Sequence, residues 1–124
     1  MLAARPRILV VDDDAEFLTY IEDGLLGFDV ATATTPLGAL WLLQRQPIDA
    51  ILCDLALGAN DGRHLLEVVQ AEYPRIARIL VTGYGGRVGE HDHEGALSAA
   101  QAILYKPCDV GLLAALLDDL PAPD

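Results

Sequence analysis

The chain has 124 residues, enough for one domain of ordinary size with a single substantial core. Its 19 acidic residues outnumber its 8 Lys and Arg, and the net charge of −11 argues against direct binding to the phosphate backbone of nucleic acid. No apolar run approaches the roughly 20 residues of a membrane-spanning helix, and the first residues lack the apolar segment of a signal peptide. We therefore expect a cytoplasmic protein with no membrane partner.

Short aliphatic runs predict five strands, and segments with helical periodicity separate them. The strands are expected at residues 7–11, 28–33, 49–54, 78–82 and 102–105. One helix is expected to begin at Pro36, after the cap Thr35, and to end before Pro47. The other helices are expected near residues 14–26, 62–72, 90–100 and 109–119.

The strict alternation of strand and helix predicts an α/β fold with a doubly wound, five-stranded parallel sheet covered by five helices. The strand at 28–33 alternates between larger and smaller or polar residues, which suits an edge position. That placement favours the strand order 2-1-3-4-5 of flavodoxin-like sheets. We expect a single domain over residues 1–124, with linker-like tails at 1–6 and 121–124.

Polar side chains stand at the ends of four of the predicted strands, at the edge where doubly wound sheets bind ligands. Asp12 and Asp13 follow the first strand, Asp54 and Thr82 are the last residues of the third and fourth, and Lys106 follows the fifth. Clustered carboxylates repel one another, and a divalent cation such as Mg²⁺ would compensate that repulsion through oxygen ligands. A carboxylate held beside a lysine and a hydroxyl can accept a phosphoryl group as an acyl phosphate. The pattern therefore predicts a phosphoryl-accepting metal site centred on Asp54.

Helix capping is the alternative interpretation of any single aspartate. Asp13 with Glu16 three residues later is typical of a capping box at the start of the first helix. Capping explains neither Thr82 nor Lys106, however. Several independent segments each supply a residue of the type that the site needs, which unrelated caps would not produce. We therefore favour a site over a set of unrelated caps.

The chain resembles the receiver domain of two-component response regulators, of the chemotaxis-regulator type. The resemblance covers essentially all of it and is carried, in order, by ILVVDDD, ILCDLALGANDG, ILVTGYG and LYKP. It implies that Asp54 is the phosphoacceptor and a direct Mg²⁺ ligand together with Asp13. It also implies that Asp12 binds the metal through water and that the Ala56 carbonyl is the remaining protein ligand.

The resemblance further implies that Thr82 follows the phosphoryl group and that Lys106 pairs with it, next to a cis peptide bond at Pro107. Ile103 departs from the family pattern, because it occupies the position where the family usually places a Tyr or Phe that swings inward on activation. Gly58 also replaces a common proline. The first departure argues against an aromatic switch.

Three further features lie outside this set. The sequence His91-Asp92-His93-Glu94 is better interpreted as a solvated loop than as a metal site, because no second segment offers ligands at a suitable spacing. Cys53 lies in an apolar run and is expected to be a buried thiol. The helix at 109–119 carries an apolar stripe with no basic residue, and the small residues around Ala114 could form part of the core or a partner surface.

The resulting hypothesis is a receiver domain switched by Mg²⁺-dependent phosphorylation of Asp54, with a histidine kinase or phosphotransfer protein as donor. Its output would be a changed affinity for a second copy or an effector at the face formed by the segments at 90–100, 102–105 and 109–119. It would be a signalling domain rather than an enzyme. Two alternatives stay open: a degenerate receiver that binds partners constitutively, favoured by Ile103 and Gly58, and a small Mg²⁺-dependent phosphohydrolase with Asp54 as nucleophile.

Overall fold

The computed structural model describes residues 5–57, 60–83 and 99–119. Its main sheet consists of β1 (Arg7–Val11), β2 (Asp29–Ala33), β3 (Ala50–Cys53), β6 (Ala77–Thr82) and β7 (Ala102–Tyr105). The helices are α1 (Ala15–Gly24), α2 (Pro36–Arg45), α3 (Gly62–Glu72) and α5 (Val110–Asp118). A separate hairpin pairs β4 (Ala56–Leu57) with β5 (Asn60–Asp61) in antiparallel fashion.

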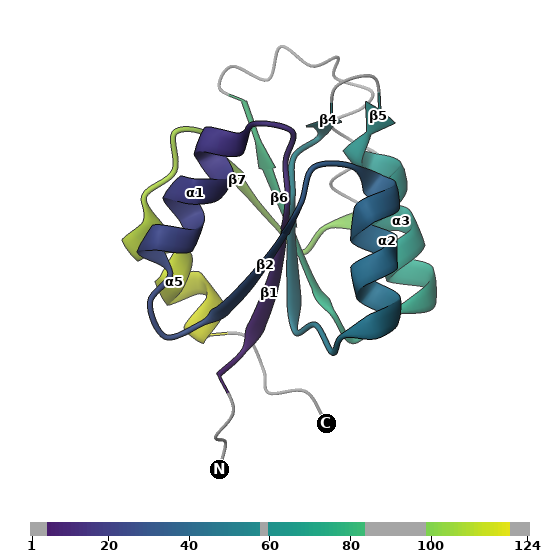
Figure 1. Ribbon diagram of the computed structural model, residues 1–124, viewed down its shortest axis with the longest axis horizontal. Coiled ribbons are helices and arrows are strands. Elements are labelled where there is room, and N and C mark those ends of the chain that lie inside the picture. The colour runs from purple at the N-terminus through teal and green to yellow at the C-terminus, as the bar shows by residue number, and fades with distance from the viewer. Residues whose placement is uncertain (1–4, 58–59, 84–98, 120–124) are drawn as a thin grey trace.

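The five strands lie in the order β2-β1-β3-β6-β7, and every neighbouring pair is parallel. Helices α1 and α5 cover one face of this sheet, and α2 and α3 cover the other (Figure 1). The predicted fold class and strand order are therefore confirmed. The helix predicted at 90–100 lies almost wholly outside the described residues, and the β4–β5 hairpin was not predicted.

Apolar side chains on the two faces of the sheet form two cores. Leu9 and Ile51 point toward α2 and α3, whereas Ile8 and Leu52 point toward α1 and α5. Successive strand residues alternate between the two faces, and both faces are covered, so β1 and β3 are apolar at nearly every position. This burial fixes the strands whose ends carry the polar residues.

Two predicted caps begin their helices as expected. The Thr35 hydroxyl accepts a hydrogen bond from the Gly38 N–H at 3.0 Å, with Pro36 at the first helical position of α2. The Asp109 carboxylate accepts one from the Gly111 N–H at 2.8 Å and begins α5. Each contact satisfies an N–H group that the helix itself leaves without an acceptor.

The apolar stripe of α5 divides between core and surface. Leu113 and Leu117 are buried, and Ala114 is partly buried against the core beneath α1. Leu112, by contrast, is 61% exposed, and Ala115 is exposed as well. Leu113, Ala114 and Leu117 therefore belong to the core. A partner surface on α5 would have to use Leu112 and Ala115 instead.

Within the described residues, none of the helices has the length and apolar character needed to cross a membrane.

Candidate functional site

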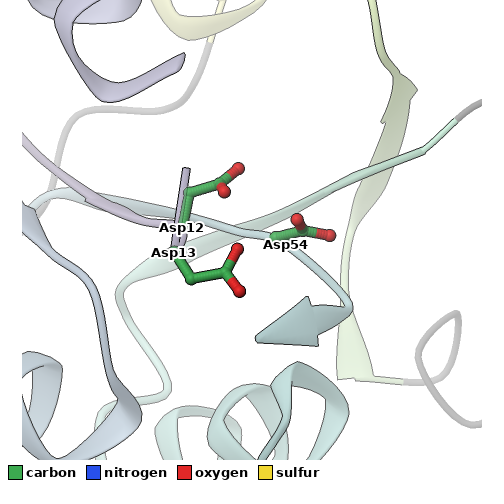
Figure 2. Close-up of side chains that lie close together, drawn as sticks. All are labelled: Asp12, Asp13 and Asp54. Carbon is green, nitrogen blue, oxygen red and sulfur yellow. The ribbon is translucent and has the colours of Figure 1, made fainter. Parts of the chain in front are cut away.

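Four chain segments bring polar side chains to one edge of the sheet. Backbone hydrogen bonds that continue the pairing of neighbouring strands fix these segments. The Asp12 N–H donates to the Ala33 carbonyl at 3.1 Å, the Asp54 N–H to the Val11 carbonyl at 3.0 Å, and the Lys106 N–H to the Thr82 carbonyl at 2.7 Å. Figure 2 shows the Asp12, Asp13 and Asp54 side chains at the ends of β1 and β3. The sequence-predicted residues Asp12, Asp13, Asp54, Thr82 and Lys106 therefore all lie at this edge.

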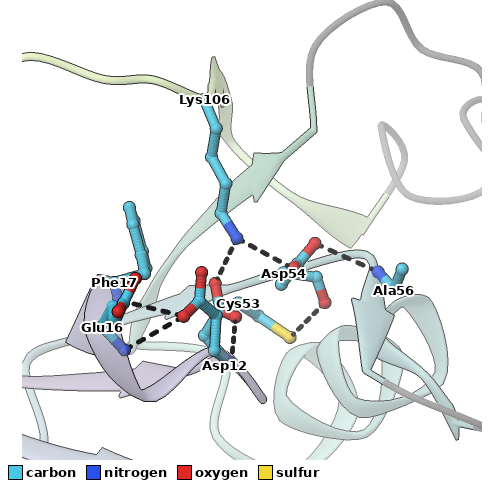
Figure 3. A network of polar contacts seen from close by, with 8 residues as sticks. Asp12, Glu16, Phe17, Cys53, Asp54, Ala56 and Lys106 are labelled. Atoms are coloured by element: carbon cyan, nitrogen blue, oxygen red, sulfur yellow. Dashed lines mark hydrogen bonds and ion pairs between the residues drawn. The ribbon is translucent and has the colours of Figure 1, made fainter.

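The Lys106 ammonium joins the two buried carboxylates. Its Nζ lies 2.6 Å from Asp12 Oδ2 and donates a hydrogen bond to Asp54 Oδ2 at 3.1 Å (Figure 3). Burial acts to lower the pKa of Lys106, but the contact with Asp12 and the charge of Asp54 outweigh it, and the pKa is raised above its ordinary value. Lys106 therefore stays charged at neutral pH. The peptide bond between Lys106 and Pro107 is cis, as the resemblance implied.

The Asp54 carboxylate is held in a fixed orientation. One oxygen, Oδ1, accepts a hydrogen bond from the Ala56 N–H at 3.1 Å, while Oδ2 faces Lys106. Burial raises the pKa of Asp54 above its ordinary value, although the charge of Lys106 and the Ala56 N–H act in the opposite direction. Only 8% of Asp54 is exposed. An oriented and poorly hydrated carboxylate of this kind is suited to act as a nucleophile.

The acidic cluster matches the ligand chemistry of a hard metal ion. Asp12, Asp13 and Asp54 each offer a carboxylate oxygen, and these oxygens lie within 4.8 Å of one another. Asp12 Oδ1 also accepts a hydrogen bond from the Asp14 N–H at 2.9 Å, which fixes that side chain. Carboxylate oxygens are the ligands that Mg²⁺ and Ca²⁺ prefer. The cluster could therefore hold a divalent cation, and the role of the Ala56 carbonyl as a further ligand stays a prediction.

The N-cap of α1 is Asp14 and not Asp13. The Asp14 carboxylate accepts hydrogen bonds from the N–H groups of Glu16 at 3.0 Å and Phe17 at 3.4 Å. The capping-box interpretation of Asp13 and Glu16 was therefore wrong. Because Asp14 begins the helix, the exposed Asp13 carboxylate is left for the metal cluster.

The Thr82 hydroxyl is buried beside these charges. Only 3% of the residue is exposed, and within the described residues its Oγ1 has no hydrogen-bond partner. A buried hydroxyl left without a partner costs about 1–3 kcal/mol. An unpaired donor at this position is suited to an anionic ligand.

A valine at position 82 should test this unpaired state. We expect Thr82→Val to leave the free energy of unfolding unchanged or to raise it by up to about 1 kcal/mol, because the substitution removes the cost of burying the hydroxyl. Thr35→Val is the matched control: its hydroxyl caps α2, so we expect a loss of about 1 kcal/mol. Urea denaturation of both variants measures the difference. Equal destabilisation of the two would show that the Thr82 hydroxyl has a partner.

Gly62 contributes to the site because it has no side chain. This role was not predicted from the sequence. A Cβ at this position would lie 1.9 Å from the Asp54 carbonyl oxygen and 3.0 Å from Cys53 Sγ. The Gly62 N–H also donates to the Leu55 carbonyl at 2.7 Å. The start of α3 thus packs directly against the backbone of Asp54. Cys53 is buried, as predicted, and its thiol lies 3.3 Å from the Asp54 carbonyl oxygen.

Ile103 lies on β7 and packs against the core beneath α2 and α3, where it is partly buried. Tyr105, at the end of the same strand, is 44% exposed. The segment from His91 to Glu94 and Gly58 both lie outside the described residues. The interpretation of that segment as a solvated loop therefore stays a prediction, and so does any effect of Gly58 in place of the usual proline.

The sequence model of the response regulator receiver domain family matches residues 8–118 of the chain. The chain belongs to this family. As a receiver domain it is the signalling module of two-component response regulators, and the family implies a histidine kinase as partner. The matched range contains all five of the polar residues predicted at the strand ends.

Curated relatives of this receiver domain are much longer proteins. The transcriptional regulatory protein ZraR of Escherichia coli K12 is 34% identical over 113 residues, which cover 90% of this chain but 25% of ZraR. The alginate biosynthesis transcriptional regulatory protein AlgB of Pseudomonas putida KT2440 is 36% identical over 110 residues, which cover 82% of this chain and 23% of AlgB. The chain thus spans about a quarter of the length of these relatives.

Solved receiver domains have the same fold over nearly the whole chain. A CheY-like response regulator receiver domain protein from Methanospirillum hungatei JF-1 superposes with a TM-score of 0.84 and 30% identity, covering 94% of both chains. The signal receiver domain of an HD domain-containing protein from Pseudomonas fluorescens Pf-5 gives a TM-score of 0.85 and 28% identity, again with 94% of both chains covered. The receiver fold is therefore shown independently of the sequence motifs.

Proposed function

We propose that this receiver domain is switched by transfer of a phosphoryl group to Asp54, with Mg²⁺ held by Asp12, Asp13 and Asp54. The observation that carries the proposal is the position of the Asp54 carboxylate, which is buried, contacts the Lys106 ammonium and belongs to the acidic cluster with Asp12 and Asp13. The donor is a phosphohistidine of a histidine kinase or phosphotransfer protein. A small acyl phosphate can replace it, since the receiver itself supplies the nucleophile.

In the transfer step, an Asp54 oxygen forms a bond to phosphorus while the bond from phosphorus to the donor imidazole nitrogen breaks. The imidazole leaves with the electron pair of that bond, and Asp54 becomes an acyl phosphate. Lys106, already 3.1 Å from Asp54 Oδ2, pairs with the charge on the phosphoryl oxygens, and the Thr82 hydroxyl donates to one of them. Mg²⁺, when bound, neutralises part of the charge shared by the carboxylates and the phosphoryl group.

The switch acts through the strands that carry these two donors. Thr82 ends β6 and Lys106 follows β7, so a phosphoryl group on Asp54 that accepts hydrogen bonds from both side chains changes the contacts at the end of the β6–β7 pair. The face formed by β7 and α5, with Leu112 and Tyr105 exposed, is the proposed surface for a second copy or an effector. Phosphorylation thereby shifts the population of the domain toward the conformer that binds such a partner more tightly.

The test is incubation of the purified protein with acetyl phosphate and Mg²⁺, followed by mass spectrometry. We expect one added phosphoryl group that hydroxylamine removes, and no addition when a chelator has removed the metal. Absence of labelling in a folded protein would favour the degenerate receiver. Continuous turnover of a phosphomonoester would favour the phosphohydrolase.

Metal binding itself should stabilise the fold. We expect Mg²⁺ to raise the melting temperature with a saturable concentration dependence, because the ion binds the folded cluster and not the unfolded chain. Asp13→Ala should weaken this gain by removing a ligand. Asp23→Asn, which alters an exposed carboxylate near the end of α1, is the control and should keep the full gain. An undiminished Mg²⁺ effect in Asp13→Ala, measured by thermal denaturation, would place the site elsewhere.

A further inference from the structure

Two aromatic side chains of α1 face the segment that carries Lys106. The Lys106 Nζ lies 4.4 Å from the centroid of the Phe17 ring (Figure 3). The Tyr20 hydroxyl donates a hydrogen bond to the Cys108 carbonyl at 2.9 Å. The two rings are themselves 6.3 Å apart and tilted by 37°. Helix α1 thus holds this segment at two points, the ammonium of Lys106 and the backbone of Cys108.

The Phe17 ring restricts the Lys106 side chain, which would otherwise be flexible. A lysine ammonium is a compact charge on a four-carbon stem, and it can take many positions in water. Asp12 and Asp54 contact the Lys106 ammonium as anions, and the face of the Phe17 ring, which carries negative charge density, covers a further side. Only 22% of the Lys106 side chain stays exposed. These contacts together hold Nζ next to Asp54 Oδ2.

The position of the Phe17 ring follows from the turn that forms the acidic cluster. The Phe17 N–H donates to the Asp14 cap at 3.4 Å, and the Asp14 N–H donates to Asp12 Oδ1 at 2.9 Å. The backbone that places Asp12 and Asp13 therefore also sets the start of the helix turn that carries Phe17. The same turn therefore presents both the Asp12 carboxylate and the Phe17 ring to Lys106.

We propose that Phe17 is a positioning residue for phosphoryl transfer: its ring holds the Lys106 ammonium against Asp54, and Tyr20 anchors the following backbone. This role rests on the proposed function of Asp54. Phe17 also packs against the core beneath α1 and α5, so loss of packing has to be separated from loss of the ring face. The separation requires one variant that keeps an apolar side chain and another that keeps an aromatic one.

The kinetic test compares rates of labelling by acetyl phosphate in the presence of Mg²⁺. We expect Phe17→Leu to slow labelling roughly two- to fivefold, the size of a partly exposed contact between a cation and an aromatic ring, and Phe17→Trp to restore the rate. Trp41→Leu is the matched control. It removes a contact of the same kind, with the Arg45 guanidinium carbon 4.1 Å from the centroid of the Trp41 ring on α2, and should leave the rate unchanged.

A nuclear magnetic resonance measurement reports the contact independently of the reaction. In the wild type, the ε-methylene protons of Lys106 should be shifted upfield by the Phe17 ring, and Phe17→Leu should abolish that shift. Equal labelling rates in Phe17→Leu and the wild type would overturn the positioning role while leaving Asp54 as acceptor. Equal slowing in the Leu and Trp variants would also overturn it, because packing would then explain the effect. Failure of the wild type to be labelled would remove the proposed function and the role of Phe17 together.

Discussion

Asp54→Asn is expected to abolish labelling by acetyl phosphate completely. The amide that replaces the carboxylate is a poor nucleophile and has no charged oxygen to form the bond to phosphorus. The amide oxygen can still accept a hydrogen bond from Ala56, and Lys106 keeps its ion pair with Asp12. The variant should therefore stay folded, so the loss would report chemistry and not unfolding. Mass spectrometry after incubation with Mg²⁺ and acetyl phosphate measures the outcome.

Asp49→Asn provides the control for this experiment. Asp49 precedes the same strand, β3, and its carboxylate accepts a hydrogen bond from the Arg7 N–H at 2.8 Å at the opposite end of the sheet. The asparagine oxygen can keep that bond, and labelling should match the wild type. Equal labelling of the Asp54 and Asp49 variants would show that another residue accepts the phosphoryl group.

The sequence was sufficient to predict the strand-end site because that site follows from topology. Once β1, β3, β6 and β7 are assigned to one parallel sheet, their carboxyl ends must meet at the same edge, and the residue after each strand is known from the chain. Apolar strands covered on both faces also leave little freedom in register, since a shift of one residue would exchange the two faces. The sequence alone was therefore enough to bring Asp12, Asp54 and Lys106 together.

Details that depend on atomic geometry could not be predicted in the same way. Any of three consecutive aspartates could cap α1, and the choice of Asp14 depends on the backbone angles of the turn, which the hydrogen bond to Asp12 helps to fix. The metal ion predicted to compensate the carboxylates stays a prediction, and the direct contacts of the Lys106 ammonium with both Asp12 and Asp54 could not be foreseen from the sequence.

Residues with apolar or absent side chains were the hardest to assign. Phe17 has the sequence pattern of a core residue in an amphipathic helix, and only its contact with Lys106 distinguishes it. The β4–β5 hairpin has two residues in each strand, too few to show an alternating pattern. The Asp61-Gly62 pair does indicate a turn, but the approach of Gly62 to the Asp54 carbonyl depends on how α3 docks.

Gly62→Ala is expected to cause the largest loss of stability among the substitutions considered. A Cβ placed 1.9 Å from the Asp54 carbonyl oxygen overlaps a backbone atom, which cannot turn away as the end of a side chain could. Either α3 or the β3–β4 connection has to shift, at a cost of about 3 kcal/mol or more. Urea denaturation should show a lower midpoint than the wild type. Labelling should also slow, because any movement of the Asp54 backbone displaces its carboxylate from Lys106.

Gly111→Ala separates this steric effect from the general cost of replacing a glycine. Gly111 lies in the first turn of α5, where the nearest neighbour of an added Cβ would be a carboxylate oxygen of Asp109 at 3.3 Å, the end of a side chain that can adjust. Alanine favours a helix over glycine by up to about 1 kcal/mol, so this variant should be as stable as the wild type or more so. If Gly62→Ala were equally stable, α3 would not pack directly on the Asp54 backbone. The orientation of the acceptor carboxylate would then depend on Ala56 and Lys106 without support from α3.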